Sequence, residues 1–195
     1  EARCLCLRRG VDPVADAETI ETELILADLE SVEKRRAGLV RKIKGGDKDA
    51  VEAERLLSAA QVLLEEGKPA RMLEVAEDDR KAFRMLQLLS SKPVLYVCNV
   101  EEDAAAEGNA LSARVAEMAA AQGAVSVVIS AAIEEEIAEL EDAGRAEFLS
   151  DMGLEEAALD RLIRAGYNLL HRRTYFTVGP KEARAWTSPA GTLAP

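Results

Sequence analysis

Apolar residues in the first third of the chain recur at the spacing of long amphipathic helices. Five apolar side chains within residues 17–44 follow alternating steps of four and three, and Arg36 occupies the remaining seam position. An average step of 3.5 residues is the period of a coiled-coil seam. The sequence therefore predicts one long helix over residues 17–44, beginning after Asp16 as its N-cap. The seam residues are Ile25, Leu29, Val32, Leu39 and Ile43.

The same pattern returns over residues 48–66 after a short interruption. Gly45 and Gly46 can adopt the left-handed conformation that ends a helix, and Asp47 can cap the next one. Because a short turn makes two helices antiparallel neighbours, we predict a helical hairpin whose tip lies near Gly46. The apolar face of the second helix is formed by Ala53, Leu56, Ala60 and Leu63, flanked by Leu57 and Leu64.

The pattern changes in the middle of the chain, after a short third helix predicted over residues 78–90. Residues 94–98 form an unbroken apolar run, which is typical of a strand buried on both faces. An alanine-rich helix follows at 110–122 with Gly123 as its C′ residue, and a second apolar run covers 125–129. This order predicts one strand–helix–strand unit with parallel strands.

The last part of the chain is predicted to contain further helices and then two strands. The strands cover 173–178 and 182–187, on either side of Gly179 and Pro180. The sequence as a whole therefore predicts a helix-rich α/β protein. The predicted helices are 133–141, 145–152 and 155–170.

Charge is distributed unevenly between the hairpin tip and the remainder of the chain. From 34 to 49 there are seven basic and two acidic residues, a net +5, so the total of −11 leaves −16 elsewhere. Such a block favours contact with phosphate backbones, although a solvated helix face has the same composition. The tip has no aromatic residue for base stacking, so the contact would not read a DNA or RNA sequence. The basic residues are Lys34, Arg35, Arg36, Arg41, Lys42, Lys44 and Lys48.

Composition narrows the class of protein further. The 195 residues are 48% apolar, which suits one or two globular domains. We expect no membrane span, because no apolar run reaches eighteen residues. Three cysteines without metal-ligand spacing, and a single histidine, argue against a zinc site and favour a reducing, cytoplasmic setting. His171 lies beside two arginines and is interpreted as an exposed residue rather than a catalytic base.

A candidate site lies where the strand 94–98 ends in Asn99 and a run of acidic residues. Ligands of open α/β sheets bind beyond the carboxyl ends of the strands, although Asn99 alone would also suit the start of a loop. A phosphate-binding Gly-x-x-x-x-Gly-Lys-Ser/Thr loop does not occur in the sequence. The glycines at 45–46 do not replace it, because they join two helices rather than a strand and a helix.

Six segments, spread over nearly the whole chain, carry a specific resemblance: 11–24, 44–50, 96–103, 164–167, 174–179 and 184–187. In these segments and in their order, the chain resembles the YchF / Obg-like ATPase family of translation-factor-related P-loop GTPases. This resemblance implies a P-loop parallel sheet with an inserted coiled-coil hairpin, followed by a β-grasp TGS domain. It also implies that the chain begins after the phosphate loop and switch regions and ends early in the TGS domain.

The resemblance also implies domain boundaries. The expected order is a remnant of the nucleotide-binding domain, the hairpin insertion, the C-terminal part of the nucleotide-binding domain, connecting helices and a truncated TGS-like start. These parts cover residues 1–19, 20–91, 92–150, 151–172 and 173–195.

Base recognition is where this chain departs from most GTPases of the class. They read guanine with Asn-Lys-x-Asp, whereas this chain has Asn99-Val100-Glu101-Glu102. Glutamate is one methylene longer than aspartate and displaces the acceptor for the guanine N1 and N2 hydrogens, a donor pair that adenine lacks. The resemblance implies that Asn99, Val100 and Glu102 contact the base. It assigns Ser130, Ala131 and Ala132 to a second base-side loop with backbone contacts.

The function implied is that of a ribosome-associated nucleoside triphosphatase. The complete protein would bind and hydrolyse ATP, with GTP weaker and with Mg²⁺, and would contact the ribosome or ribosomal RNA through the basic hairpin. We expect a monomer, and a chain that does not hydrolyse ATP without the phosphate loop, since positioned charge around the phosphates dominates phosphoryl transfer. The alternative is a non-enzymatic helical adaptor that uses the same hairpin.

Overall fold

The computed structural model describes residues 11–191, and only the backbone of residues 142 and 143. It divides into two units, Glu1–Pro93 and Val94–Pro195, which are described separately below. Cys4 and Cys6 lie outside the described residues, as does most of the predicted remnant 1–19. None of the described helices is both long enough and apolar enough to cross a membrane.

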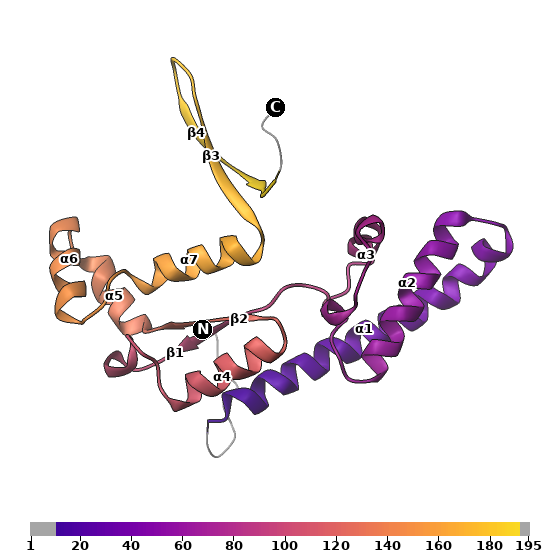
Figure 1. Ribbon diagram of the computed structural model, residues 1–195, viewed down its shortest axis with the longest axis horizontal. Coiled ribbons are helices and arrows are strands. Elements are labelled where there is room, and N and C mark those ends of the chain that lie inside the picture. Colours follow the sequence, from indigo (N-terminus) through magenta and orange to yellow (C-terminus); the bar gives the residue numbers. More distant parts are fainter. Residues whose placement is uncertain (1–10, 192–195) are drawn as a thin grey trace. The chain divides into compact units, whose positions relative to one another are not determined.

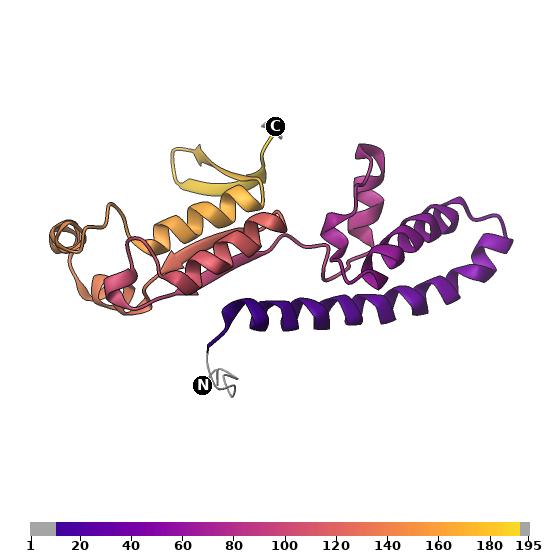
Figure 2. The same ribbon diagram turned by 60° about the horizontal axis from the view of Figure 1, so that its bottom comes forward.

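The first unit is built on two helices that lie side by side in both views (Figures 1 and 2). Helix α1 spans Pro13–Lys44 and α2 spans Lys48–Glu65, so the predicted hairpin is present. The prediction that Asp16 caps α1 was wrong. Asp12 is the N-cap, accepting from Ala15 N at 3.4 Å, and Pro13 begins the helix, because a first-turn residue needs no backbone N–H.

The turn between the two helices uses the residues that the sequence singled out. Gly46 has a φ of +80°, a conformation that side chains with a Cβ atom rarely adopt. Asp47 then caps α2 by accepting from Asp49 N at 3.1 Å and Ala50 N at 3.2 Å. The chain reversal therefore depends on one glycine and one aspartate.

The core of this unit is formed by three segments rather than two: α1, α2 and the segment that follows α2. Leu57 and Leu64 of α2 are buried, whereas Ala53 and Leu63 of the predicted seam are only half-buried. This difference arises because the segment after α2 packs into the same core, turning the buried face of α2 away from a purely two-helix seam. The buried cluster consists of Ile25, Val32, Leu56, Leu57, Ala60, Leu64, Ala70, Leu86 and Leu88.

The third predicted helix, 78–90, is shorter than expected. Between α2 and residue 90 the chain forms two 3₁₀ turns, Ala70–Met72 (η1) and Glu77–Asp79 (η2), and then one α-helix, α3, which spans only Arg80–Met85. Gln87 has a positive φ of 55°, which ends the helical path. The following residues then run back against α1 instead of forming another turn of helix.

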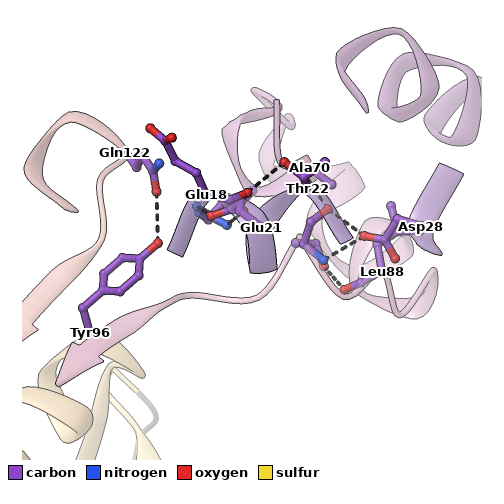
Figure 3. Close-up of polar contacts among 11 residues, drawn as sticks. Glu18, Glu21, Thr22, Asp28, Ala70, Leu88, Tyr96 and Gln122 are labelled. Atoms are coloured by element: carbon purple, nitrogen blue, oxygen red, sulfur yellow. Dashed lines mark hydrogen bonds and ion pairs between the residues drawn. The ribbon is translucent and has the colours of Figure 1, made fainter. Parts of the chain in front are cut away.

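Buried polar contacts attach this returning segment to α1 (Figure 3). Asp28, 2% exposed, accepts hydrogen bonds from Leu89 N at 2.8 Å, Ser90 N at 2.7 Å and Ser90 Oγ at 2.6 Å. Ser90 Oγ in turn accepts from Ala70 N at 3.0 Å. Nearer the start of α1, Glu21 accepts from both guanidinium arms of Arg71, a residue of η1, at 2.7 and 2.8 Å. The returning segment is thus an integral part of the unit.

The second unit contains the predicted strand–helix–strand arrangement. Strands β1 (Leu95–Asn99) and β2 (Val125–Ile129) pair in parallel, with Leu95 opposite Val125 and Asn99 opposite Ile129. Helices α4 (Ala110–Ala121) and α7 (Ala158–Leu169) lie on opposite faces of this pair (Figure 1). Tyr96 Oη donates to Gln122 Oε1 at 3.3 Å, linking β1 to the end of α4 (Figure 3).

Burial of β1 differs from the prediction. The run 94–98 was expected to be buried on both faces, but its residues are half-buried and Val97 is 45% exposed. Among the described residues only β2 pairs with β1, and a sheet of two strands offers little surface for the helices to cover. The predicted parallel pairing is nevertheless confirmed, as is the helix-rich α/β class.

The remaining elements follow the predicted order with shifted ends. They are the 3₁₀ turn η3 (Glu102–Ala104), α5 (Ala131–Glu139), α6 (Asp142–Asp151), and the antiparallel strands β3 (Arg172–Val178) and β4 (Ala183–Pro189). A small core formed by Ala105, Ile133, Ile137 and Leu154 joins η3, α5 and the turn after α6. The strands β3 and β4 are exposed almost throughout.

Replacing the buried carboxylate of Asp28 tests its role in the first unit. Asp28→Ala removes the acceptor for three hydrogen bonds and leaves buried N–H and O–H groups unpaired, so we expect a loss of about 3 kcal/mol in unfolding free energy. Urea unfolding followed by far-ultraviolet circular dichroism measures this loss. Glu33→Ala, an exposed change on the same helix, is the matched control. Equal stability of the two variants would contradict this role.

Candidate functional site

The candidate site is built on the carboxyl ends of the two parallel strands. Asn99 is the last residue of β1 and lies opposite Ile129, the last residue of β2. Val100 N donates to Ile129 O at 2.9 Å, which continues the ladder by one residue. Parallel pairing therefore brings Asn99 beside the turn Ser130-Ala131-Ala132, although the two segments are about thirty residues apart in the sequence.

A direct hydrogen bond joins the two segments. Asn99 Oδ1 accepts from the backbone N–H of Ala131, the first residue of α5, at 2.9 Å. Because Oδ1 is used in this bond, Nδ2 is the polar atom of Asn99 that remains to contact a ligand. The side chain of Asn99 is exposed, so a ligand could reach it.

Ser130 is the residue of this turn whose buried side chain lacks a hydrogen-bond partner among the described residues. It is 2% exposed, and the atom without a partner is its Oγ. It occupies the N-cap position of α5 without making the side-chain bond usual for a capping serine. A buried hydroxyl without a partner is costly, and in a strand-end turn it is an available contact for a ligand. No feature of the sequence could have shown this.

The other two predicted base-side residues lie just beyond β1. Val100 is half-buried. Glu102 is exposed at the start of η3, and its carboxylate has no polar partner among the described residues. Its carboxylate is therefore free to turn toward a ligand held at Asn99. Cys98 precedes this group, and burial raises the pKa of its thiol, so the thiol stays protonated near neutral pH.

Two charged residues that the sequence did not single out contact the backbone on either side of the turn. Glu134 accepts a hydrogen bond from Ala158 N, and Arg161 donates to Val128 O. The partners are 24 and 33 residues apart, so neither contact has a local sequence signature. A separate open cavity of about 260 Å³ includes Arg161 but none of the predicted base-side residues. It is lined by Ala106, Gly153, Leu154, Glu155, Glu156 and Arg161.

The seven basic residues of the hairpin fall into two groups. Lys34 pairs with Glu30 at 2.5 Å, Arg35 donates to Leu86 O, and Arg36 pairs with Glu54 at 2.7 Å. The hydrogen bond to Glu54 raises the pKa of Arg36 above its ordinary value, so this charge is held within the hairpin. The other four are exposed, and their side chains have no polar partner among the described residues. They are Arg41, Lys42, Lys44 and Lys48.

Comparisons with known proteins point to one group of relatives. No protein-family model matches the chain. It is 48% identical over 187 residues to "Ribosome-binding ATPase YchF" of Bacillus subtilis, and 46% identical over 185 residues to the protein of the same name from Escherichia coli O157:H7. Each alignment covers 95% of this chain and 51% of the relative. The chain thus spans about half the length of the curated relatives it matches.

A solved structure leads to the same relatives. The Schizosaccharomyces pombe YchF GTPase matches with a TM-score of 0.83 and 28% identity, covering 100% of this chain and 53% of that one. Both comparisons extend over nearly all of this chain, so the match includes the hairpin and the strand-end site together. The resemblance to the YchF family is therefore confirmed: over 95% of its length, the chain is homologous to about half of a YchF protein.

Proposed function

We infer that this chain carries the base-recognition side of a YchF-type nucleotide site, in a protein that binds and hydrolyses ATP in preference to GTP when complete. The hydrogen bond between Asn99 Oδ1 and Ala131 N carries this proposal, because it joins the two segments expected to face the base. The relatives named as ribosome-binding ATPases support it. The proposed contacts are Asn99, Val100, Glu102, Ser130, Ala131 and Ala132.

The proposed site fits the base better than it fits the metal. The unpartnered Ser130 Oγ, the free Nδ2 of Asn99 and the exposed Glu102 together offer donors and acceptors to a planar heterocycle. Within residues 11–191, no three His, Cys, Asp or Glu side chains are grouped so that they could hold a metal ion. The Mg²⁺ expected with ATP is therefore not assigned to any described residue.

The carboxylate length at position 102 gives the sharpest test of base preference. In a full-length YchF-type protein containing this chain, ATP should bind more tightly than GTP by isothermal titration. Glu102→Asp restores the shorter acid that reads guanine in related GTPases, so the ATP-to-GTP affinity ratio should fall about tenfold, the effect of about 1.4 kcal/mol. Glu101→Asp, the exposed neighbour, is the control and should leave the ratio unchanged.

Other results of this titration would contradict the proposal. Equal or reversed wild-type affinities would refute the preference for adenine. Failure to bind either nucleotide would favour the alternative of a non-enzymatic adaptor. An unchanged ratio in Glu102→Asp would remove Glu102 from the site.

We further propose that α1 and α2 form the coiled-coil insertion and that its tip contacts the ribosome or ribosomal RNA. The division between Pro93 and Val94 supports the predicted boundary between 20–91 and 92–150. The antiparallel pairing of β3 with β4 supports the start of a TGS-like domain at 173–195. A ribosomal partner would agree with the cytoplasmic setting predicted from the cysteines, and a monomer remains our prediction.

The split among the hairpin cations refines which of them reach a phosphate backbone. Lys34, Arg35 and Arg36 have partners within the hairpin unit, so the four unpaired cations near the turn are the proposed contacts. Their long side chains need break no internal bond to meet a phosphate, and they form no ion pair with an acid among the described residues. Contact would therefore release counterions and depend strongly on salt.

Neutralising the unpaired cations tests this footprint. A variant with Arg41, Lys42, Lys44 and Lys48 changed to Gln should bind ribosomes more weakly, with the slope of log affinity against log salt shallower by roughly 3. Cosedimentation at several salt concentrations measures both quantities in the full-length protein. The control changes four exposed cations elsewhere, Lys81, Arg84, Lys92 and Lys181, to Gln. Equal effects of the two variants would show that net charge matters and the hairpin tip does not.

A further inference from the structure

Just after the turn 130–132, Glu134 links the chain to helix α7. This glutamate lies in the first turn of α5, and its Oε1 accepts from Ala158 N at 2.6 Å. Ala158 is the first residue of α7, where Ala157 provides no side-chain cap. The carboxylate therefore satisfies an otherwise open N–H group at the positive end of a twelve-residue helix.

A second contact runs in the opposite direction, from α7 to the strand that precedes the turn. Arg161 lies one turn into α7, and its Nη2 donates to the backbone oxygen of Val128 at 3.2 Å. Its Nε is buried and has no partner among the described residues, so the guanidinium is held against the end of β2. The nearby Glu156 is engaged by Arg164 at 2.6 and 2.9 Å.

These two contacts enclose the turn. The Arg161 contact is made two residues before Ser130, and the Glu134 contact is made two residues after Ala132. Between them, Ala131 N donates to Asn99 Oδ1. A closed ring therefore runs from Val128 through the turn to Glu134, across to α7, and back through Arg161.

We propose that Glu134 and Arg161 are positioning residues that hold the 130–132 turn in place for the nucleotide base. Neither needs to touch the base: each fixes one end of the segment whose backbone and Ser130 hydroxyl face it. This role rests on the proposed function, because it takes the turn to be a base contact, whereas the ring of contacts does not depend on that function. A purely structural role would instead stabilise the packing of α7 without affecting the turn selectively.

Amide hydrogen exchange in the 195-residue chain separates these two roles. Glu134→Ala and Arg161→Gln should each speed exchange of the Ala131 amide about tenfold relative to wild type, while amides of α4 stay unchanged. The controls Glu135→Ala and Arg164→Gln alter exposed neighbours on the same two helices and should stay within about twofold. Uniform acceleration across the unit, or no change at Ala131, would overturn the proposal.

Conservative variants and nucleotide binding complete the test. Glu134→Gln keeps an oxygen that can accept from Ala158 N, and Arg161→Lys keeps a cation that can donate to Val128 O, so both should keep much of the wild-type Ala131 protection. In the full-length protein, Glu134→Ala and Arg161→Gln should weaken ATP binding about tenfold and the two controls should not.

The exchange measurement and the ATP-binding measurement can fail separately. If wild-type protein binds no ATP, the proposed function fails, while the exchange data still report on the ring. If Ala131 exchange speeds up but ATP affinity is unchanged, the positioning role is overturned and the nucleotide site stands.

Discussion

Parallel pairing of β1 with β2 is the constraint on which the candidate site depends. Asn99 ends one strand and Ile129 ends the other, so the register places Asn99 beside the turn that starts at Ser130. A shift of one residue would move Asn99 away from Ala131 N and would send its side chain to the opposite face of the sheet. The site is therefore a consequence of strand register, and the side-chain bond between Asn99 and Ala131 reinforces the same alignment.

In the hairpin, fewer cations are available to an external partner than the sequence contains. Seven cations over residues 34–48 look equivalent in the sequence, but three of them have partners within the hairpin unit itself. Arg36 in particular occupies a seam position, where an unpaired cation facing the partner helix would be costly to bury. Glu54 and Gln61 of α2 remove that cost, and in doing so they withdraw Arg36 from any external partner.

Periodicity predicted the elements well where a single helix or strand decides the pattern. Helices α1, α2 and α4, and both parallel strands, match their predicted ranges to within a few residues. The start of α1 was misplaced because Asp12 and Asp16 both suit an N-cap, and the predicted helix, which began at residue 17, did not use Pro13 as its first residue. Burial was harder to predict, because it depends on segments distant in sequence. Val97 is 45% exposed in a strand that pairs only with β2 among the described residues, whereas Leu64 is buried in a core that the segment after α2 completes.

The candidate site also contains some residues that the sequence could predict and others that it could not. Asn99 and the turn 130–132 could be proposed because each follows an apolar strand, and the resemblance supplied their roles. Glu134 and Arg161 could not be proposed, because acidic and basic residues are common on exposed helix faces and their backbone partners belong to other elements.

In the first unit, the burial of Asp28 could not be predicted either, because its hydrogen-bond partners are distant in the sequence. It sits next to Leu29 on the inner face of α1, where a carboxylate would ordinarily be excluded. Three donors from Leu89 and Ser90 compensate for its burial, and these donors are available only when residues 86–90 leave the helical path. The early end of α3 and the buried charge on α1 therefore depend on each other: a third helix continuing to residue 90, as its apolar spacing suggested, would use those amides internally and leave Asp28 unpaired.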